Sequence, residues 1–316
     1  MYAVTIIDKE LRWSEHPDPS AGVGEIVVDI ASAGINGADR LQVAGFYPAP
    51  AGSPADIPGL EFAGVVSAVG PGAARFNVGD RVMGVVGGGG QAQRIAVHER
   101  LVMPVPTMMS DDEAGGFTEV FTTAHDALFT QAGLVMGERV LIHGAAGGVG
   151  VAAIQMARAA GAHVTVTARH TELHERLIEL GAHRALTPDE FAEGNEAPFD
   201  VVLELVGAAN LAMNLRLLAM RGRIVIIGVG AGPRSDINLL DVMNKRAHIM
   251  GSTLRARSLE DKAVAARAVE RHVLPLVESG AITVPVHERW PMTDADAAYN
   301  SFSAGRKLGK IVLVND

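Results

Sequence analysis

Residues 140–162, with the sequence VLIHGAAGGVGVAAIQMARAAGA, constrain the fold more than any other stretch of this chain. The stretch begins with the apolar run 140–142, which is typical of a fully buried parallel strand. A turn of small residues, 144–150, comes next. Residues 151–160 then favour a helix, because they contain neither glycine nor proline. With a second apolar run at 164–166, these segments predict a βαβ unit.

The glycines of this turn indicate a ligand as well as a fold. They let the backbone turn tightly and approach a pyrophosphate, which binds the amides at a helix N-terminus. Glycine triplets also occur in ordinary loops, but here a strand precedes the turn and a helix follows it. We therefore predict a dinucleotide site formed by Ala146, Gly147, Gly148 and Val149.

The chain beyond this unit continues to alternate between strands and helices. Strands are predicted at 201–205, 223–227 and 248–251, and helices at 171–181 and 211–219. Such alternation predicts a doubly wound parallel sheet. Four residues should form the buried face of the first of these helices: Leu173, Leu177, Ile178 and Leu180.

The first hundred residues show a different pattern. Short β segments at 25–30, 64–69, 81–86 and 94–97 are separated by Gly/Pro turns, which predicts a partly open β domain. The glycine run 87–90 is predicted to be a loop. Three other segments have a clear pattern: 114–131 is helical, 259–279 is a long helix, and 310–314 is a strand that returns to the β domain.

Composition excludes several classes of function. The net charge of −9 comes from interspersed acidic and basic residues, so the chain has no basic patch for nucleic acid. No apolar run approaches the about 20 residues that a membrane span needs, and the N-terminus lacks a signal-peptide pattern. The absence of cysteine excludes disulfides, thiolate catalysis and Cys-ligated zinc. We expect a cytoplasmic protein that binds neither nucleic acid nor membrane.

Five short motifs, taken in order, resemble one protein family. They are 36–39 (NGAD), 45–48 (GFYP), 58–64 (PGLEFAG), 143–150 (HGAAGGVG) and 251–258 (GSTLRARS). Over essentially its whole length the chain resembles the zinc-independent medium-chain dehydrogenases/reductases, and within them the NADPH:quinone oxidoreductase branch that includes zeta-crystallin. The motifs are specific for this branch and much less specific for a substrate.

The resemblance implies an α/β fold in which a Rossmann domain, residues 118–254, is inserted into a partly open, GroES-like β-barrel catalytic domain made of 1–117 and 255–316. The active-site cleft would lie between the domains. No metal is implied, because the positions that hold zinc ligands in zinc-dependent relatives carry Asn36 and Leu60 here. The eleven histidines are scattered along the chain, and most are expected at the surface.

By the same resemblance, three side chains serve the reaction. The Tyr47 hydroxyl would bond the substrate carbonyl and share the negative charge that arrives with hydride. Asn36 would face the nicotinamide ribose or the substrate, and Thr123 would lie beside the nicotinamide carboxamide. Simpler interpretations stay open for two of them: Tyr47 as an aromatic cap on the β domain, and Asn36 as a turn residue that caps local amides.

Two further segments are expected near the nicotinamide. Gly228 and Val229 follow a predicted strand, and parallel sheets of this class bind ligands at the carboxyl ends of their strands. The resemblance also places Ser252, Thr253 and Leu254 over this end of the cofactor.

Arg169 and His170 are expected at the end of the second strand of the nucleotide fold. NAD-preferring relatives carry an acidic residue there, whereas an arginine suits the 2′-phosphate of NADPH. We therefore predict NADPH as the cofactor, with a merely solvated Arg169 as the alternative. Relatives often carry a tyrosine after the next strand, where this chain has Thr187.

The predicted function is a metal-free, NADPH-dependent oxidoreductase that transfers hydride or electrons to a quinone. The alternatives are a reductase of other α,β-unsaturated carbonyls or of enoyl thioesters, and a cofactor-binding protein without significant turnover. An enoyl-thioester reductase would need a basic groove for a phosphopantetheine arm, and no basic cluster is expected near the cleft. The apolar edge strand 248–251 predicts a homodimer formed through the nucleotide domain.

Overall fold

The computed structural model describes residues 1–194 and 196–315. The chain forms two compact units: unit 1 consists of Met1–Thr122 and the segment that begins at Leu254, and unit 2 consists of Thr123–Thr253. Helix α3 (Thr118–His125) runs across the first boundary, whereas the sequence motifs placed the boundaries after residues 117 and 254. In the described part of the chain, no helix is long and apolar enough to cross a membrane.

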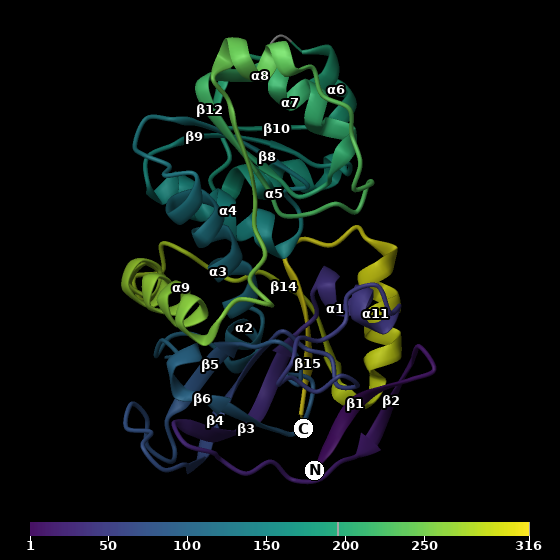
Figure 1. The fold of residues 1–316 in the computed structure, drawn as a ribbon, viewed down its shortest axis with the longest axis vertical. Helices are drawn as coiled ribbons and strands as arrows, with labels where there is room; N and C mark the ends of the chain where they lie inside the picture. The colour runs from purple at the N-terminus through teal and green to yellow at the C-terminus, as the bar shows by residue number, and fades with distance from the viewer. Residues whose placement is uncertain (195, 316) are drawn as a thin grey trace. The chain divides into compact units, whose positions relative to one another are not determined.

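Unit 2 is a doubly wound parallel sheet, as predicted (Figure 1). The strand order is β10-β9-β8-β11-β12-β13, and the five pairings that join these strands are parallel. Because the chain moves outward from β8 to β10 and then restarts at β11, the strand order reverses between β8 and β11. The strands are β8 (Arg139–His143), β9 (His163–Thr167), β10 (Arg184–Leu186), β11 (Phe199–Glu204), β12 (Leu218–Ile226) and β13 (His248–Gly251).

The helices of unit 2 connect these strands. They are α4 (Gly148–Ala159), α5 (His174–Glu179), α6 (Pro188–Glu193), α7 (Leu211–Leu217) and α8 (Leu239–Lys245). The predicted helix 171–181 is shorter and begins with a 3₁₀ turn, η3 (Thr171–Leu173). Its predicted buried face was wrong in part: Leu177 is fully buried, but Ile178 is 43% exposed. Adjacent helical residues point about 100° apart, so both cannot face the sheet.

Unit 1 is built on a mostly antiparallel sheet with the order β14-β15-β3-β4-β5-β7 (Figure 1). β3 is the strand with the most partners in this sheet, because it pairs with β4, β6 and β15. The C-terminal strand therefore returns to the β domain, as predicted. The strands are β3 (Glu25–Gly34), β4 (Glu61–Val69), β5 (Arg81–Val85), β6 (Arg94–His98), β7 (Val102–Pro104), β14 (Val286–Pro291) and β15 (Lys310–Val314), with a separate pair, β1 (Tyr2–Ile7) and β2 (Glu10–Glu15).

The helices of unit 1 correct one prediction. The expected single helix 259–279 is two helices, α9 (Leu259–His272) and α10 (Leu274–Glu278). Pro275 lies in the first turn of α10, and without an N–H it cannot continue the hydrogen bonding of α9. The other helices are α1 (Gly37–Val43), α2 (Asp111–Gly115) and α11 (Ala295–Ala304), and α3 continues into a π-helical segment, η2 (Asp126–Gln131).

Candidate functional site

The glycine turn after β8 presents unpaired backbone amides. Helix α4 has Gly147 as its N-cap, and no side chain caps this helix end. Its first-turn amides are therefore available to an anion. Residues 146–149 are partly exposed. Gly150 is required for packing, since a Cβ there would lie 2.5 Å from the Ala145 carbonyl oxygen. The turn fits a dinucleotide pyrophosphate.

Arg169 and His170 follow β9, where the sequence placed them. The Arg169 side chain is exposed and forms no ion pair with any residue the structure describes. His170 Nδ1 lies 3.7 Å from the Glu172 carboxylate. Arg169 thus offers an uncompensated cation at the strand end, which fits a 2′-phosphate. Thr187 has a structural role instead, because it caps α6 by accepting from the Glu190 amide.

A buried polar network holds the carboxyl edge of the three central strands. His143 of β8 contacts Thr167 Oγ1 of β9 through Nδ1 and Asn214 Oδ1 through Nε2, both at 2.8 Å. Asn214 Nδ2 in turn donates to Glu204 Oε2 of β11 at 2.7 Å. The carboxylate fixes the amide orientation, so Nε2 of His143 must carry the proton and Nδ1 accepts from Thr167. The second carboxylate oxygen accepts from the amides of the turn after β11, Val206 and Gly207.

His143 is the clearest exception to the expectation of surface histidines. It is buried, and burial lowers its pKa although the Glu204 charge opposes the shift. The network positions the strand ends that carry the predicted ligand site. Sequence reasoning missed it, although polar residues at the ends of three apolar strands were an available signal.

The residues predicted near the nicotinamide fall into both units. Thr123 opens unit 2, and Gly228 and Val229 follow β12, where Val229 is half-exposed. Ser252 donates its hydroxyl to Asp126 Oδ2 at 3.1 Å, and Thr253 is the last residue of unit 2. Leu254 lies in unit 1, where it is buried with Val85 and Ala265.

Asn36 and Asp39 cap the first helix of unit 1. Asp39 Oδ2 accepts from the Asn36 amide at 2.8 Å, and Oδ1 accepts from the Gly59 amide at 3.1 Å. Burial raises the pKa of Asp39 to about 6, although both amide contacts and the Lys310 charge oppose the shift. Asp39 therefore ties α1 to the segment that contains Glu61.

The Asn36 carboxamide belongs to a buried ion-pair network that the sequence did not predict. The Lys310 ammonium lies 2.7 Å from Glu61 Oε1 and donates to Asn36 Oδ1 at 2.7 Å and to the Ile35 carbonyl at 3.0 Å. Asn36 Nδ2 donates to Glu61 Oε1 at 2.9 Å. Both polar ends of the Asn36 side chain thus have partners inside unit 1, as the interpretation of Asn36 as a structural residue requires.

These residues do not fit a zinc ion. Asn36 Oδ1 already faces the Lys310 ammonium, which would repel a second cation, and the neighbouring Leu60 side chain has no ligand atom. Among residues 1–194 and 196–315, no group of three or more His, Asp or Glu side chains is arranged to hold a metal.

Tyr47 lies in the loop after α1, and its side chain is partly exposed. Its hydroxyl has no hydrogen-bond partner among the described residues, so it is available to a ligand. The ring is fixed from the other side by Arg255, whose guanidinium lies 5.0 Å from the ring centroid. Arg255 also donates to the Tyr47 carbonyl at 2.8 Å, to the Gly87 carbonyl at 2.7 Å, and to Gln42 Oε1. Sequence reasoning missed this residue.

A cavity of about 580 Å³ lies within unit 1 beside Arg255. Its lining includes Arg255, Arg257 and Lys262, so a basic cluster does line a cavity of this unit. The sequence could not show that residues of the C-terminal segment share a wall with the 87–90 loop. The expectation of no basic cluster concerned the predicted cleft between the domains, which this cavity does not test, so it stays a prediction.

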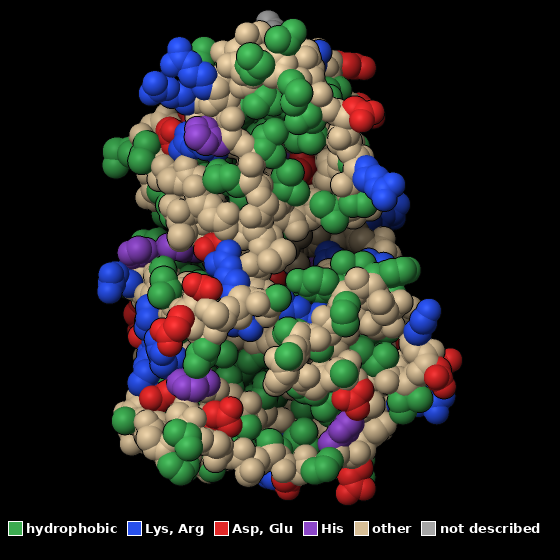
Figure 2. Space-filling model, viewed as in Figure 1, with side chains coloured by type: hydrophobic (Ala, Val, Ile, Leu, Met, Phe, Trp, Pro, Cys, Tyr) green, Lys and Arg blue, Asp and Glu red, His purple; other side chains and the backbone are tan. Residues whose placement is uncertain are grey.

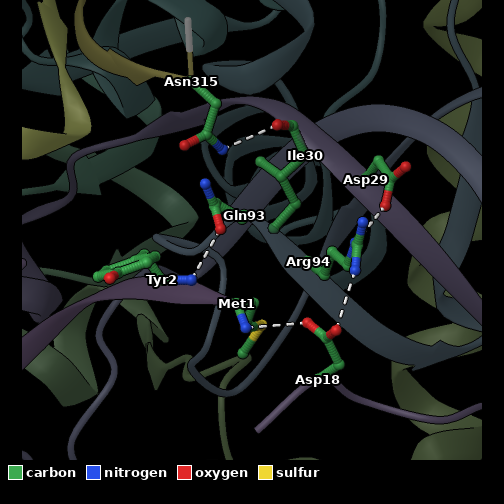
Figure 3. A pocket seen from close by; sticks show the side chains of 8 residues that line it. All are labelled: Met1, Tyr2, Asp18, Asp29, Ile30, Gln93, Arg94 and Asn315. Carbon is green, nitrogen blue, oxygen red and sulfur yellow. Dashed lines mark hydrogen bonds and ion pairs between the residues drawn. The ribbon is translucent and has the colours of Figure 1, made fainter. Parts of the chain in front are cut away.

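A second hollow of unit 1, of about 400 Å³, lies near the N-terminus (Figure 3). Its charged groups are paired with one another: Asp18 contacts the terminal ammonium at 2.9 Å and Arg94 at 3.2 Å, and Arg94 also contacts Asp29 at 2.9 Å. This hollow therefore presents no uncompensated charge to a ligand.

Two family models match the chain. The alcohol dehydrogenase GroES-like domain model matches residues 22–107, and the zinc-binding dehydrogenase model matches residues 148–270. A probable oxidoreductase from Mycobacterium abscessus is 31% identical, with a TM-score of 0.85, and the match covers 99% of this chain and 98% of that one. The chain belongs to the medium-chain dehydrogenase/reductase family, as its motifs predicted. It is an oxidoreductase whose parallel-sheet unit binds a nicotinamide cofactor.

Individual relatives differ in length and chemistry. A mycocerosic acid synthase-like polyketide synthase of Mycobacterium tuberculosis is 36% identical, and the match covers 92% of this chain but only 14% of that protein. The quinone oxidoreductase of Rattus norvegicus is 28% identical, with 94% and 91% covered. Among solved structures, the CurK enoyl reductase has a TM-score of 0.85 at 27% identity, with 100% and 99% covered. A mycobacterial protein solved with NADPH has a TM-score of 0.84 at 26% identity, with 99% of each chain covered.

Proposed function

We propose that this protein is an NADPH-dependent reductase of conjugated carbonyl acceptors, with a quinone as the first acceptor class. The observation that carries the proposal is the Tyr47 hydroxyl, which has no partner among the described residues while Arg255 fixes its ring and backbone. A donor held in place and available to a ligand is what an acceptor carbonyl needs as negative charge develops on its oxygen. The likeness to the rat quinone oxidoreductase supports the choice of acceptor.

In this proposal the cofactor residues come from unit 2, apart from Leu254 of unit 1. The amides of Gly148 and Val149 at the start of α4 hold the pyrophosphate, and Arg169 pairs with the 2′-phosphate. The reduced nicotinamide supplies the hydride when it is bound. The His143–Asn214–Glu204 network keeps the strand ends rigid, so that Gly228 and Val229 border the nicotinamide in a fixed geometry.

The reaction residues proposed in unit 1 orient the acceptor. Tyr47 donates its hydroxyl proton in a hydrogen bond to the acceptor carbonyl, and with water it is the candidate source of the proton that completes the reduction. The Asn36 carboxamide donates to Glu61 and accepts from Lys310. In this proposal Asn36 therefore affects the acceptor site indirectly, through these two side chains. Thr123, at the start of unit 2, is assigned to the nicotinamide carboxamide.

Replacing Tyr47 by Phe tests this function, because it removes only the hydroxyl. Turnover of NADPH with the best acceptor from a panel of quinones, enones and enoyl thioesters should fall about tenfold to a hundredfold. NADPH affinity should stay unchanged. Unchanged turnover would reduce Tyr47 to a packing residue, and no acceptor-dependent oxidation by the wild type would indicate a cofactor-binding protein without turnover.

Enoyl thioesters are the second candidate acceptor. Three basic side chains, Arg255, Arg257 and Lys262, line a cavity of unit 1, and a basic groove is what such a substrate would require. The similarity to a polyketide synthase and to the CurK enoyl reductase supports the same class. A higher kcat/KM for an enoyl thioester than for any quinone would make this the primary activity.

We also propose a homodimer formed through unit 2. Strand β13 is an edge of the sheet, and hydrophobic side chains gather over α7 and α8 on the same unit (Figure 2). The exposed apolar residues of this region are Met220, Leu239, Leu240, Met243 and Ile249. Such a patch is typical of an interface. Sedimentation should show a dimer at micromolar protein, and Met243→Lys should shift it to a monomer; a monomeric wild type would refute the proposal.

A further inference from the structure

Glu204 is the last residue of β11 and a buried charge of unit 2. It is 1% exposed, and the groups that donate to its carboxylate are neutral backbone and side-chain amides. Oε1 accepts from the backbone amides of Val206 and Gly207 at 2.7 and 2.8 Å, and Oε2 accepts from Asn214 at 2.7 Å. A buried carboxylate is destabilising unless hydrogen-bond donors surround it. Glu204 therefore fixes the turn after β11, because this turn must keep two backbone amides directed at Oε1.

The turn after β11 packs against the loop after β12, which contains the half-exposed Val229. The Ala231 amide of this loop donates to the Val206 carbonyl at 2.8 Å. Gly207 brings the two backbones into contact, because a Cβ there would lie 2.9 Å from the Cα atom of Val229. Its φ of 123° also favours glycine at this position. The position of Val229 is therefore set by the turn that Glu204 holds.

The end of β9, which Arg169 follows, is held by different contacts. Thr167 is paired with both neighbouring strands of the sheet, β8 and β10. The next residue, Ala168, donates its amide to the Leu186 carbonyl at 2.9 Å. These are backbone contacts within the sheet, so they remain when the Glu204 carboxylate is removed. Loss of that carboxylate should therefore move the loop after β12 and leave Arg169 in place.

We propose that Glu204 is a positioning residue for the nicotinamide half of the cofactor, and that it acts through the turn after β11 on Val229. This inference rests on the cofactor residues of the proposed function, and it assigns the two halves of the cofactor to separate supports. The adenosine half depends on Arg169 and on the backbone of β9, whereas the nicotinamide half depends on the Glu204 carboxylate. Removal of this carboxylate should therefore weaken the contacts of one half and spare those of the other.

Glu204→Leu tests this assignment, because it removes both acceptor oxygens and keeps a side chain of similar size. The Kd of NADPH should rise about tenfold, because the nicotinamide loses its fixed border. The Kd of adenosine 2′,5′-bisphosphate, which lacks the nicotinamide half, should match the wild type. An unchanged Kd for the bisphosphate also shows that unit 2 is folded. Equal losses for both ligands, or no loss for either, would overturn the proposal.

Glu204→Gln is the matched control. Its amide oxygen can still accept from Val206 and Gly207, and the Asn214 amide can turn over to meet its N–H group. Both Kd values should therefore stay close to those of the wild type. A rise in the Kd of NADPH as large as that in Glu204→Leu would overturn the role of the turn.

Gly207→Ala tests the same path without changing the carboxylate, and it carries the test if Glu204→Leu does not fold. The added methyl group would displace Val229, so this variant should bind NADPH more weakly and bind the bisphosphate as the wild type does. Unchanged binding of both ligands would overturn the link between the turn and the nicotinamide.

Isothermal titration calorimetry measures these affinities without turnover, so this inference and the proposed function fail separately. If no acceptor is reduced but Glu204→Leu weakens NADPH alone, the reductase function fails and the role of Glu204 stands. If acceptors are reduced and Glu204→Leu weakens both ligands equally, the role of Glu204 fails alone. Should the wild type prefer NADH, then NADH and ADP take the places of the two ligands.

Discussion

Each unit places a buried polar network under its proposed site, and the two networks balance charge in different ways. In unit 1, the Lys310 ammonium neutralises the Glu61 carboxylate at 2.7 Å, with both side chains almost fully buried. In unit 2, no cation faces Glu204 within the hydrogen-bonded network; backbone amides and the Asn214 amide solvate it instead. The comparison teaches that a buried carboxylate can be stabilised by a paired charge or by oriented dipoles, and that these should fail differently.

Removing the Lys310 ammonium from the ion pair of unit 1 should have the largest effect on the free energy of unfolding. Lys310→Met keeps a long apolar side chain but leaves Glu61 charged, buried and unpaired, so the free energy of unfolding should fall by about 3–5 kcal/mol. Urea denaturation measures this loss. The double variant Lys310→Met/Glu61→Gln should recover part of the stability, because it removes the unpaired charge. A single variant as stable as the wild type would show that the ion pair contributes nothing net.

The two networks should also respond to pH with opposite signs. The pKa of His143 is lowered from 6.5, so the unfolded state binds more protons below that pH and the stability of unit 2 falls as pH falls. The pKa of Asp39 is raised from 3.8 to about 6, so its contribution to unit 1 is present at low pH and is lost as pH rises through that interval.

Two variants separate these contributions. In chemical denaturation at several pH values, His143→Gln should weaken the loss of stability below pH 6.5. Asp39→Asn should remove the opposite trend below about pH 6. Identical pH profiles for the wild type and both variants would contradict the assignment of these buried groups.

The sequence predicted the sheet of unit 2 better than the details of unit 1, for physical reasons. Strands buried on both faces are short apolar runs, so β8, β9 and β11 were recognisable. The β1–β2 hairpin was missed because its turn uses Asp8 and Lys9 at positive φ (51° and 69°) without glycine or proline.

The candidate site shows the same division. The glycine turn and Arg169 were predicted because the chemistry lies in consecutive residues next to one strand. The Lys310–Asn36 contact joins residues 274 positions apart, and Arg255 and Tyr47 are likewise brought together only by the fold. Local patterns cannot show such partners, so the ion-pair network and the support of Tyr47 required the structure.

The most direct test of the central claim is the choice of cofactor. NADPH and NADH differ only in the 2′-phosphate, and Arg169 is the exposed cation at the end of β9 that would recognise it. Titration of both cofactors against the wild type and Arg169→Ala should show NADPH bound about ten- to a hundredfold more tightly by the wild type. The variant should lose most of that preference and keep its affinity for NADH. Equal wild-type affinities, or equal losses for both cofactors, would contradict the account.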